Sequence, residues 1–283
     1  MFEAVEFASE GVTLRGRFYH PTHAAPWRAV VMTHGTTATI TMCLDRYAEV
    51  FCRAGLAVLL YDHCNFGLSS GEPRQLINPW LQARGYRDAM TYLLTRGDVR
   101  ADKIAAWGDS YSGMITLAVG ALDPRYAAVA AQCPACGIEK PKQEPDEQNF
   151  QAMRAIFDGG DITGTPETTT GPLPVVSADQ LGTPSLLKPI QAYRWFIEYG
   201  GRQGTLWENR VIRVIPPWGV CAMSAIAGNL LQNSVTSRPR GLKACLSVRS
   251  CAATVEGGGF MISDTKLGAA SDGCGWSTTE KLG

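Results

Sequence analysis

Four short apolar runs alternate with segments of helical spacing, and this alternation limits the fold more than any other feature of the sequence. The runs are too short for helices and lack apolar–polar alternation, as expected of strands buried on both faces. They are residues 29–33, 56–61, 104–107 and 126–131. Helical spacing covers 41–54, 77–96 and 111–122. We therefore predict an α/β fold, a mostly parallel sheet with helices on both faces.

Two alternating runs precede these segments. Residues 2–7 and 12–19 are separated by the turn signal Ser9-Glu10-Gly11, which predicts an antiparallel hairpin at the start of the sheet. In sheets of this kind, ligands bind at the carboxyl ends of the parallel strands. Functional residues are therefore expected in the loops that follow residues 33, 61, 107 and 131.

The character of the chain changes twice. Residues 1–137 carry the alternating pattern of strands and helices. Residues 138–215 contain a charged stretch, a Gly/Thr/Pro linker at 158–174 and an aromatic helix within 186–200, which fits a lid inserted into an α/β domain before the chain returns to the core. Residues 216–283 are rich in Ser, Gly and Ala and hold four cysteines. We predict no strand–helix–strand unit there, so the last strands of the fold are not assigned.

The charge balance argues against several classes of partner. The 26 basic residues equal the 26 acidic ones, and no block of like charge indicates nucleic acid or a membrane surface. The first residues lack the basic start and apolar run of a secretory signal, and no stretch approaches the ~18 apolar residues of a membrane span. A cytoplasmic protein with a small-molecule substrate is the simplest interpretation. The sequence does not indicate an oligomeric state.

Nine cysteines are an odd count. Those in or beside predicted core elements are Cys43, Cys52, Cys64, Cys133 and Cys136. We expect reduced, buried thiols rather than a disulfide framework. The C-x-x-C spacing of Cys133 and Cys136 is typical of redox motifs, but such motifs open a helix, whereas this one ends a predicted strand. No second Cys/His pair is placed to complete a zinc site, so no metal is expected.

The segment after run 104–107 has the pattern of a nucleophile elbow. It reads Gly-Asp-Ser-Tyr-Ser-Gly over residues 108–113, and a helical pattern follows at once. Such a turn exposes its serine only if the neighbours are small. Gly108, Ser112 and Gly113 meet this need, with Ser112 in place of the second glycine of G-x-S-x-G. We predict Ser110 as a nucleophile; the alternative is a small residue in a strand-to-helix turn.

Two further motifs follow earlier predicted strands. His34-Gly35-Thr36-Thr37 comes after run 29–33, and a backbone amide in it, assigned to Thr36, would pair with the amide of Tyr111 as an oxyanion hole. The turn-rich stretch D-H-C-N-F-G-L-S-S-G-E-P-R occupies 62–74. All three motifs occur in order, each at the end of a predicted strand, which makes them a strong joint signal.

Together these motifs resemble the α/β-hydrolase superfamily. The similarity is greatest to its dienelactone-hydrolase-like and peptidase S15-like branch, which consists mostly of esterases, peptidases and related acyl hydrolases. The resemblance covers residues 5–137, continues loosely to Trp207–Arg213 and then stops. It implies an acyl-enzyme on Ser110, a small-molecule acyl substrate with an ester or amide bond, and no cofactor.

The resemblance also implies an acid and a histidine after the nucleophile. The only histidines are His20, His23, His34 and His63, all before Ser110. Near the expected place the chain has Gly259. Candidate acids after Ser110 are Asp161, Asp179, Asp264 and Asp272. None follows a recognisable strand, so the catalytic acid stays unassigned and no catalytic histidine is found.

Two explanations for the missing catalytic histidine stay open. Either the chain after about Pro217 is not the natural continuation of the hydrolase, which we favour, or a hydrolase-like protein has lost its base. Both predict activity reduced by about four to six orders of magnitude. His34 and His63 lie at strand ends, and we expect them to orient their own loops rather than to act as base. The alternatives to a hydrolase are an inactive hydrolase-like binding protein and a damaged gene product without stable function.

Overall fold

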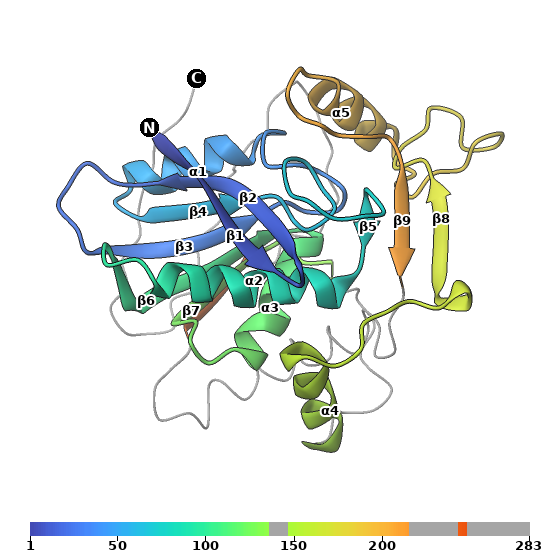
Figure 1. Cartoon of the computed structure of the whole chain (residues 1–283). Helices are drawn as coiled ribbons and strands as arrows, with labels where there is room; N and C mark the ends of the chain where they lie inside the picture. Colours follow the sequence, from blue (N-terminus) through green and yellow to red (C-terminus); the bar gives the residue numbers. More distant parts are fainter. Residues whose placement is uncertain (136–146, 215–242, 248–283) are drawn as a thin grey trace. The chain divides into compact units, whose positions relative to one another are not determined.

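The computed structural model describes residues 1–135, 147–214 and 243–247 (Figure 1). The chain forms two compact units, Met1–Cys251 and Ala252–Gly283. The second unit lies wholly outside the described residues, so every described helix and strand belongs to the first unit.

A seven-stranded sheet forms the centre of this unit, in the order β1-β2-β4-β3-β6-β7-β10. The strands are β1 (Phe2–Ser9), β2 (Val12–Tyr19), β3 (Trp27–Thr33), β4 (Ala57–Tyr61), β6 (Val99–Asp109), β7 (Ala128–Gln132) and β10 (Lys243–Ser247). β1 and β2 form the predicted antiparallel hairpin, and β2 is also antiparallel to β4. Every other neighbouring pair is parallel. The predicted α/β fold is therefore confirmed.

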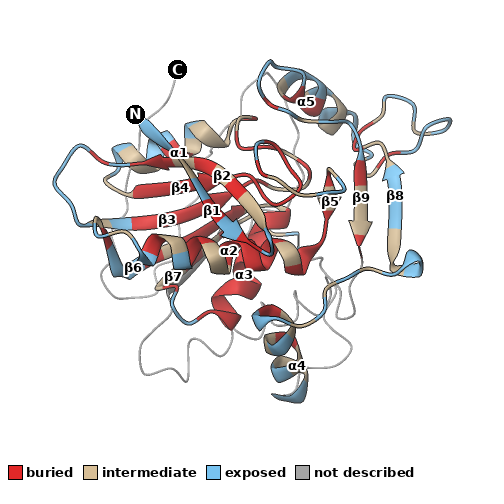
Figure 2. Cartoon of the chain, in the orientation of Figure 1, coloured by how far each residue is buried: buried red, intermediate tan, exposed pale blue. Residues whose placement is uncertain are grey.

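Three helices cover the two faces of this sheet, α1 (Leu44–Arg53), α2 (Pro79–Leu94) and α3 (Tyr111–Leu122). Alternate strand side chains belong to different buried clusters: Val31 and Leu59 pack with α2 and α3, whereas Val30 and Leu60 pack with α1. This is the period-two alternation of a strand buried on both sides. Figure 2 shows β3, β4 and α3 buried along most of their length.

The inserted segment has more regular structure than predicted. It comprises α4 (Glu147–Asp158), the 3-10 turn η1 (Pro166–Thr168), β8 (Thr169–Leu173), α5 (Ile190–Gly200) and β9 (Val211–Val214). The prediction of a linker over 158–174 was wrong for β8, which pairs antiparallel with β9. Its partner lies about forty residues further along the chain, so no local pattern could indicate the pairing.

A second sheet joins this insertion to the core. The two-residue strand β5 (Leu76–Ile77) follows the loop after β4 and pairs parallel with β9, giving the order β5-β9-β8. The predicted boundaries at 137 and 215 fall in or beside residues outside the described ranges, and they stay predictions. β10 is a strand within 216–283, where none was assigned from sequence. None of the helices in the described ranges is long and apolar enough to cross a membrane.

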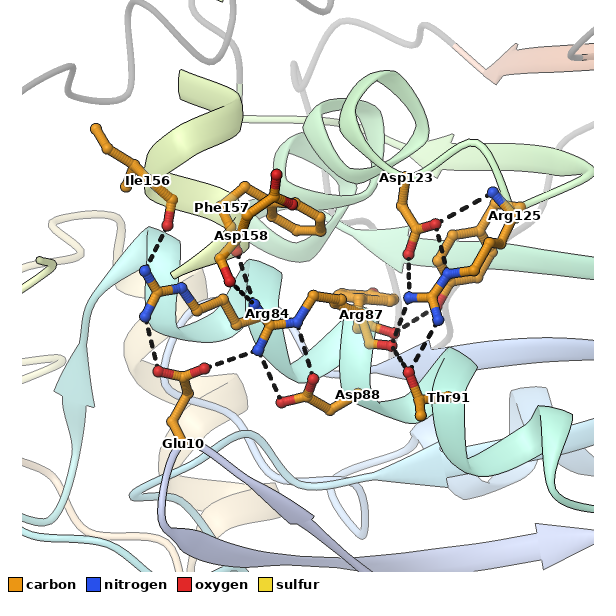
Figure 3. Close-up of polar contacts among 12 residues, drawn as sticks. Glu10, Arg84, Arg87, Asp88, Thr91, Asp123, Arg125, Ile156, Phe157 and Asp158 are labelled. Atoms are coloured by element: carbon orange, nitrogen blue, oxygen red, sulfur yellow. Dashed lines mark hydrogen bonds and ion pairs between the residues drawn. The ribbon is translucent and has the colours of Figure 1, made fainter. Parts of the chain in front are cut away.

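A cluster of charged side chains ties the hairpin turn to α2 and α4 (Figure 3). The Glu10 carboxylate bridges two α2 guanidinium groups, accepting from Arg84 at 2.7 Å and from Arg87 at 2.8 Å. Both arginines also donate to backbone carbonyls at and just after the end of α4. The acceptors belong to Ile156, Phe157, Asp158 and Gly160. Because a helix ends with unpaired carbonyls, cations at this position stabilise it. We call this cluster the arginine clamp.

The cysteine prediction needs a correction. Cys64 is buried, but Cys43, Cys52 and Cys133 are only partly buried. The reason is position: Cys43 and Cys52 lie at the two ends of α1, and Cys133 follows the last residue of β7. Cys136 lies outside the described residues. Within the described ranges, no cluster of metal-binding side chains is found.

Candidate active site

Ser110 occupies a strained turn between β6 and α3. β6 ends at Asp109 and α3 begins at Tyr111, while Ser110 itself has φ 54° and ψ −114°. A positive φ is uncommon for a residue other than glycine and costs about 1–3 kcal/mol. Backbone hydrogen bonds to the end of β7 and to the segment after it hold this conformation: the Ser110 amide donates to the carbonyl of Gln132 at 2.9 Å, and the Ser110 carbonyl accepts from the amide of Ala135 at 3.0 Å. The fold therefore enforces the turn.

The glycines of this turn are required by close packing. A Cβ atom on Gly108 would lie closer than 3.0 Å to the backbone of Ser112 and to the side chain of Thr116. One on Gly113 would lie 3.0 Å from the carbonyl of Gln132. Larger side chains at these positions would push α3 away from β6 and β7. We call residues 108–113 the elbow.

The loop after β3 lies directly against the elbow. A Cβ atom on Gly35 would be 3.0 Å from the carbonyl oxygen of Asp109 and 3.3 Å from Cβ of Ser110. Tyr111 is the first residue of α3, and the first amides of a helix have no acceptor within it. The segments that carry Thr36 and Tyr111 therefore meet at Ser110. Their pairing as oxyanion donors stays a prediction. We call residues 34–37 the oxyanion loop.

Two histidines lie buried under this junction. The His34 ring accepts a hydrogen bond at Nε2 from the amide of His63 (3.1 Å), and its Nδ1 lies 3.0 Å from the carbonyl oxygen of Gly35. Nε2 of His63 lies 3.0 Å from the hydroxyl of Ser112. That hydroxyl also donates to the carbonyl of His34. The His34 ring thus connects its own loop to the loop after β4, and the His63 ring is bound to Ser112 in α3. That the two histidines orient loops rather than act as base stays a prediction.

Burial keeps both rings neutral. It lowers the pKa of His34 to about 4, an effect that the hydrogen bond to Gly35 only partly offsets. Burial, and then the neighbouring His34, hold the pKa of His63 well below its ordinary value. Nε2 of His34 lies 3.8 Å from Asp62, but this is no ion pair, since the ring is neutral and that nitrogen already accepts the His63 amide.

The motif after β4 is a self-supporting loop. The Asp62 carboxylate accepts the amides of Ile40 and Leu68, each at 2.9 Å. Arg74 at the other end donates to the carbonyl of Ser69 at 2.6 Å. Burial raises the pKa of Asp62 to about 6, although the two amide bonds act in the opposite direction. These contacts explain the motif residues as supports of the loop beside the candidate site.

Asp109 is a site feature that the sequence analysis did not single out. Its carboxylate lies beside the oxyanion loop, since a Cβ atom on Gly35 would be 3.7 Å from Oδ2. Burial raises the pKa of Asp109 to about 6, offset in part by a hydrogen bond from the Ser110 amide. The residue before Ser110 thus carries a carboxyl group whose pKa is well above its ordinary value. In the sequence, only its position next to Ser110 in the elbow could have indicated Asp109 as a site residue.

The other candidates for acid and base are exposed or lie outside the described residues. His20 and His23 are exposed. Asp161 and Asp179 are also exposed, and their carboxylates accept amides in their own turns. Asp264, Asp272 and Gly259 lie outside the described residues. No acid or base is therefore assigned to Ser110.

The aromatic residues of α5 face the core. Phe196 is buried, and Tyr193, Trp195 and Tyr199 pack against the main hydrophobic cluster. The ring nitrogens of Trp195 and Trp207 are buried without a hydrogen-bond partner in the described part of the chain. The packing explains the aromatic stripe found in the sequence.

Comparisons with known proteins show which proteins this chain resembles. No protein-family model matches the chain. A thiohydrolase, apmlB of Arthrinium phaeospermum, is 40% identical over 151 residues, covering 53% of this chain and 46% of the relative. The quorum-quenching protein AidA of Acinetobacter baumannii is 36% identical over 130 residues, covering 46% and 43%. The crystal structure of the α/β hydrolase GrgF from Penicillium matches with a TM-score of 0.56 and 25% identity, over 88% of this chain and 90% of GrgF.

The chain belongs to the α/β-hydrolase superfamily. Its matches to these two curated relatives span less than half of their length. Within the superfamily, the narrower resemblance to the dienelactone-hydrolase-like and peptidase S15-like branch stays a prediction. As an α/β hydrolase, the chain has its elbow at the carboxyl end of a central strand, where this fold binds ligands.

Proposed function

We propose that this α/β hydrolase cleaves or transfers an acyl group of a small ester, thioester or amide, with Ser110 as nucleophile. The strained turn at Ser110 carries the proposal, because the surrounding hydrogen bonds maintain a costly conformation that exposes a hydroxyl. The relatives support the acyl chemistry, since they are named thiohydrolases, an acyltransferase and polyketide transferases. We propose the cytoplasm as its location.

The reaction would proceed through an acyl-enzyme. Oγ of Ser110 attacks the acyl carbonyl carbon and loses its proton, while the carbonyl oxygen becomes an oxyanion held by the amides of Tyr111 and Thr36. The carbon–oxygen, carbon–sulfur or carbon–nitrogen bond then breaks, and the leaving group takes up a proton. Water or a second alcohol, thiol or amine releases the acyl group and restores the hydroxyl. These steps need no cofactor.

No side chain is assigned to accept the proton of Ser110 in this mechanism. Burial holds the pKa of both His34 and His63 low, which makes them weak bases, and Nε2 of each ring is bound to another group. The sequence has no histidine after Ser110. We therefore propose that the proton passes to solvent or buffer, which leaves residual catalysis from positioning and the oxyanion hole. The same observation favours the second candidate, an inactive hydrolase-like protein that binds acyl compounds without turnover.

Labelling with a fluorophosphonate probe tests the proposal. The purified chain, Ser110→Ala and the control Ser177→Ala, which changes a serine in a local turn, are compared with and without added imidazole. We expect slow labelling that needs Ser110, increases with imidazole concentration and parallels p-nitrophenyl acetate hydrolysis. A folded chain that does not label at any imidazole concentration would refute the hydrolase proposal and favour the binding protein.

A further inference from the structure

The Ser112 hydroxyl connects the elbow to both adjacent loops. It lies in the first turn of α3, donates to the carbonyl of His34 at the end of β3, and lies 3.0 Å from Nε2 of His63 after β4. All three residues are at most 1% exposed. We propose that Ser112 and His63 are a positioning pair that holds the oxyanion loop against the elbow. The catalytic consequence of this pair rests on the proposed function, but the contacts themselves do not.

The hydrogen bond from Ser112 to His34 assigns the protons of both rings, and it leaves Nδ1 of His63 buried without a hydrogen-bond partner among the described residues. A hydroxyl has a single proton, and that of Ser112 is directed to the carbonyl of His34. Its oxygen therefore accepts from His63, which must carry its proton on Nε2. Nε2 of His34 accepts from the His63 amide, so the His34 proton is on Nδ1 and donates to Gly35. The two rings thus have opposite tautomers.

This arrangement closes a ring of contacts through three segments. Ser112 binds His34, His34 accepts the amide of His63, and the His63 ring returns to Ser112. The two imidazole rings also meet edge to face, with centroids 4.8 Å apart. Gly35, the next residue after His34, packs so closely against Ser110 that an added Cβ atom would lie 3.3 Å from Cβ of Ser110. Movement of Ser112 would therefore displace the loop that carries the Thr36 amide.

A steric explanation for residue 112 is insufficient. A small residue at this position is enough to form the turn, and glycine would satisfy that need. Glycine or alanine would remove the buried hydroxyl that the His34 carbonyl and the His63 ring both contact. The serine is therefore explained by its hydroxyl and not only by its size.

The test compares Ser112→Ala with a matched control in the same helix. Thr116→Val also removes a buried hydroxyl, but that hydroxyl donates to the carbonyl of Ser112 and not to a loop. The rate constant of fluorophosphonate labelling and the dissociation constant of the probe are measured separately. We expect Ser112→Ala to lower the rate constant about tenfold or more, with probe binding within about twofold, because the donor is misplaced. Thr116→Val should stay within about twofold of the native rate constant.

The His63 variants separate positioning from folding. His63→Gln retains an amide donor in place of Nε2–H and is expected to keep more of the labelling rate constant than His63→Phe, which has none. Equal rate constants for the native chain, Ser112→Ala and His63→Phe would overturn the positioning pair, while Ser110-dependent labelling would still support the hydrolase.

Nitrogen-15 NMR of the histidine rings tests the positioning pair independently of catalytic activity. We expect His63 as the Nε2–H tautomer and His34 as the Nδ1–H tautomer in the native chain. The His63 ring proton should exchange slowly with water in the native chain and in Thr116→Val, and faster in Ser112→Ala. An Nδ1–H tautomer of His63, or an exchange rate unaffected by Ser112→Ala, would overturn the positioning pair even in a chain that never labels.

Discussion

Replacing Glu10 with glutamine should weaken the arginine clamp and destabilise the chain. The Glu10 side chain is 23% exposed, whereas its partners Arg84 and Arg87 are 4% and 21% exposed. Exposed ion pairs contribute about 0.2–1 kcal/mol, and breaking a buried pair costs about 3–5 kcal/mol. The clamp lies between these limits, so we expect a loss of about 2 kcal/mol in the free energy of unfolding at pH 7, or a Tm lower by about 4–8 °C.

The stability lost in Glu10→Gln should decrease as pH falls. Burial alone would raise the pKa of Glu10, but the hydrogen bonds and charges of Arg84 and Arg87 outweigh it and hold the pKa below 4.5. A carboxyl with a lowered pKa in the folded state stabilises the fold above its unfolded pKa and loses this effect as pH falls through the folded pKa. The difference in stability between the native chain and Glu10→Gln should therefore be smaller at pH 3 than at pH 7.

Urea unfolding at pH 7 and pH 3 measures both effects. Glu6→Gln is the matched control, since Glu6 lies on the same hairpin and pairs with Arg15 at 3.4 Å, where the two side chains are 67% and 41% exposed. We expect this control to change stability by less than about 0.5 kcal/mol. Similar losses for the two variants, or a Glu10→Gln loss as large at pH 3 as at pH 7, would refute the reasoning.

Three further predictions concern single groups near the site. Asp109→Asn should raise the free energy of unfolding at pH 8 by up to about 3 kcal/mol and leave it unchanged below about pH 4. The reason is that the pKa of the native carboxyl is raised from 3.8 to about 6, so the folded state of the native chain is destabilised as pH rises through this range. Urea unfolding at pH 8 and below pH 4 checks this. Gly67→Ala should cost more stability than Gly11→Ala, since both have positive φ but only Gly67 faces a side chain, the Asp62 carboxylate, closer than 3.0 Å; equal losses would contradict it. Cys64, with a pKa raised by burial to about 11, should resist iodoacetamide at pH 8 until urea unfolds the chain, as mass spectrometry can show.

Much of the core followed from local patterns. The buried runs became β3, β4, β6 and β7, and the intervening helices became α1, α2 and α3 with ends shifted by a few residues. These elements are recognisable because their periods of burial are written in consecutive residues. By contrast, β8 and β9 pair across about forty residues, and β10 joins β7 from over a hundred residues away. Pairing at such distances leaves no local signal.

In the candidate site, too, some features follow from the sequence and others from tertiary packing. The sequence alone determined the α/β class, the position of Ser110 in a strand-to-helix turn, and the lack of any histidine after it within this chain, because these depend on residue order. Only the tertiary structure decided that His34 and His63 are bound to each other and to Ser112, that Asp109 borders the oxyanion loop, and that Glu10 ties the hairpin to α4. Each of these depends on which side chains meet when the sheet, loops and helices pack, and packing brings together residues that the order of the chain keeps apart.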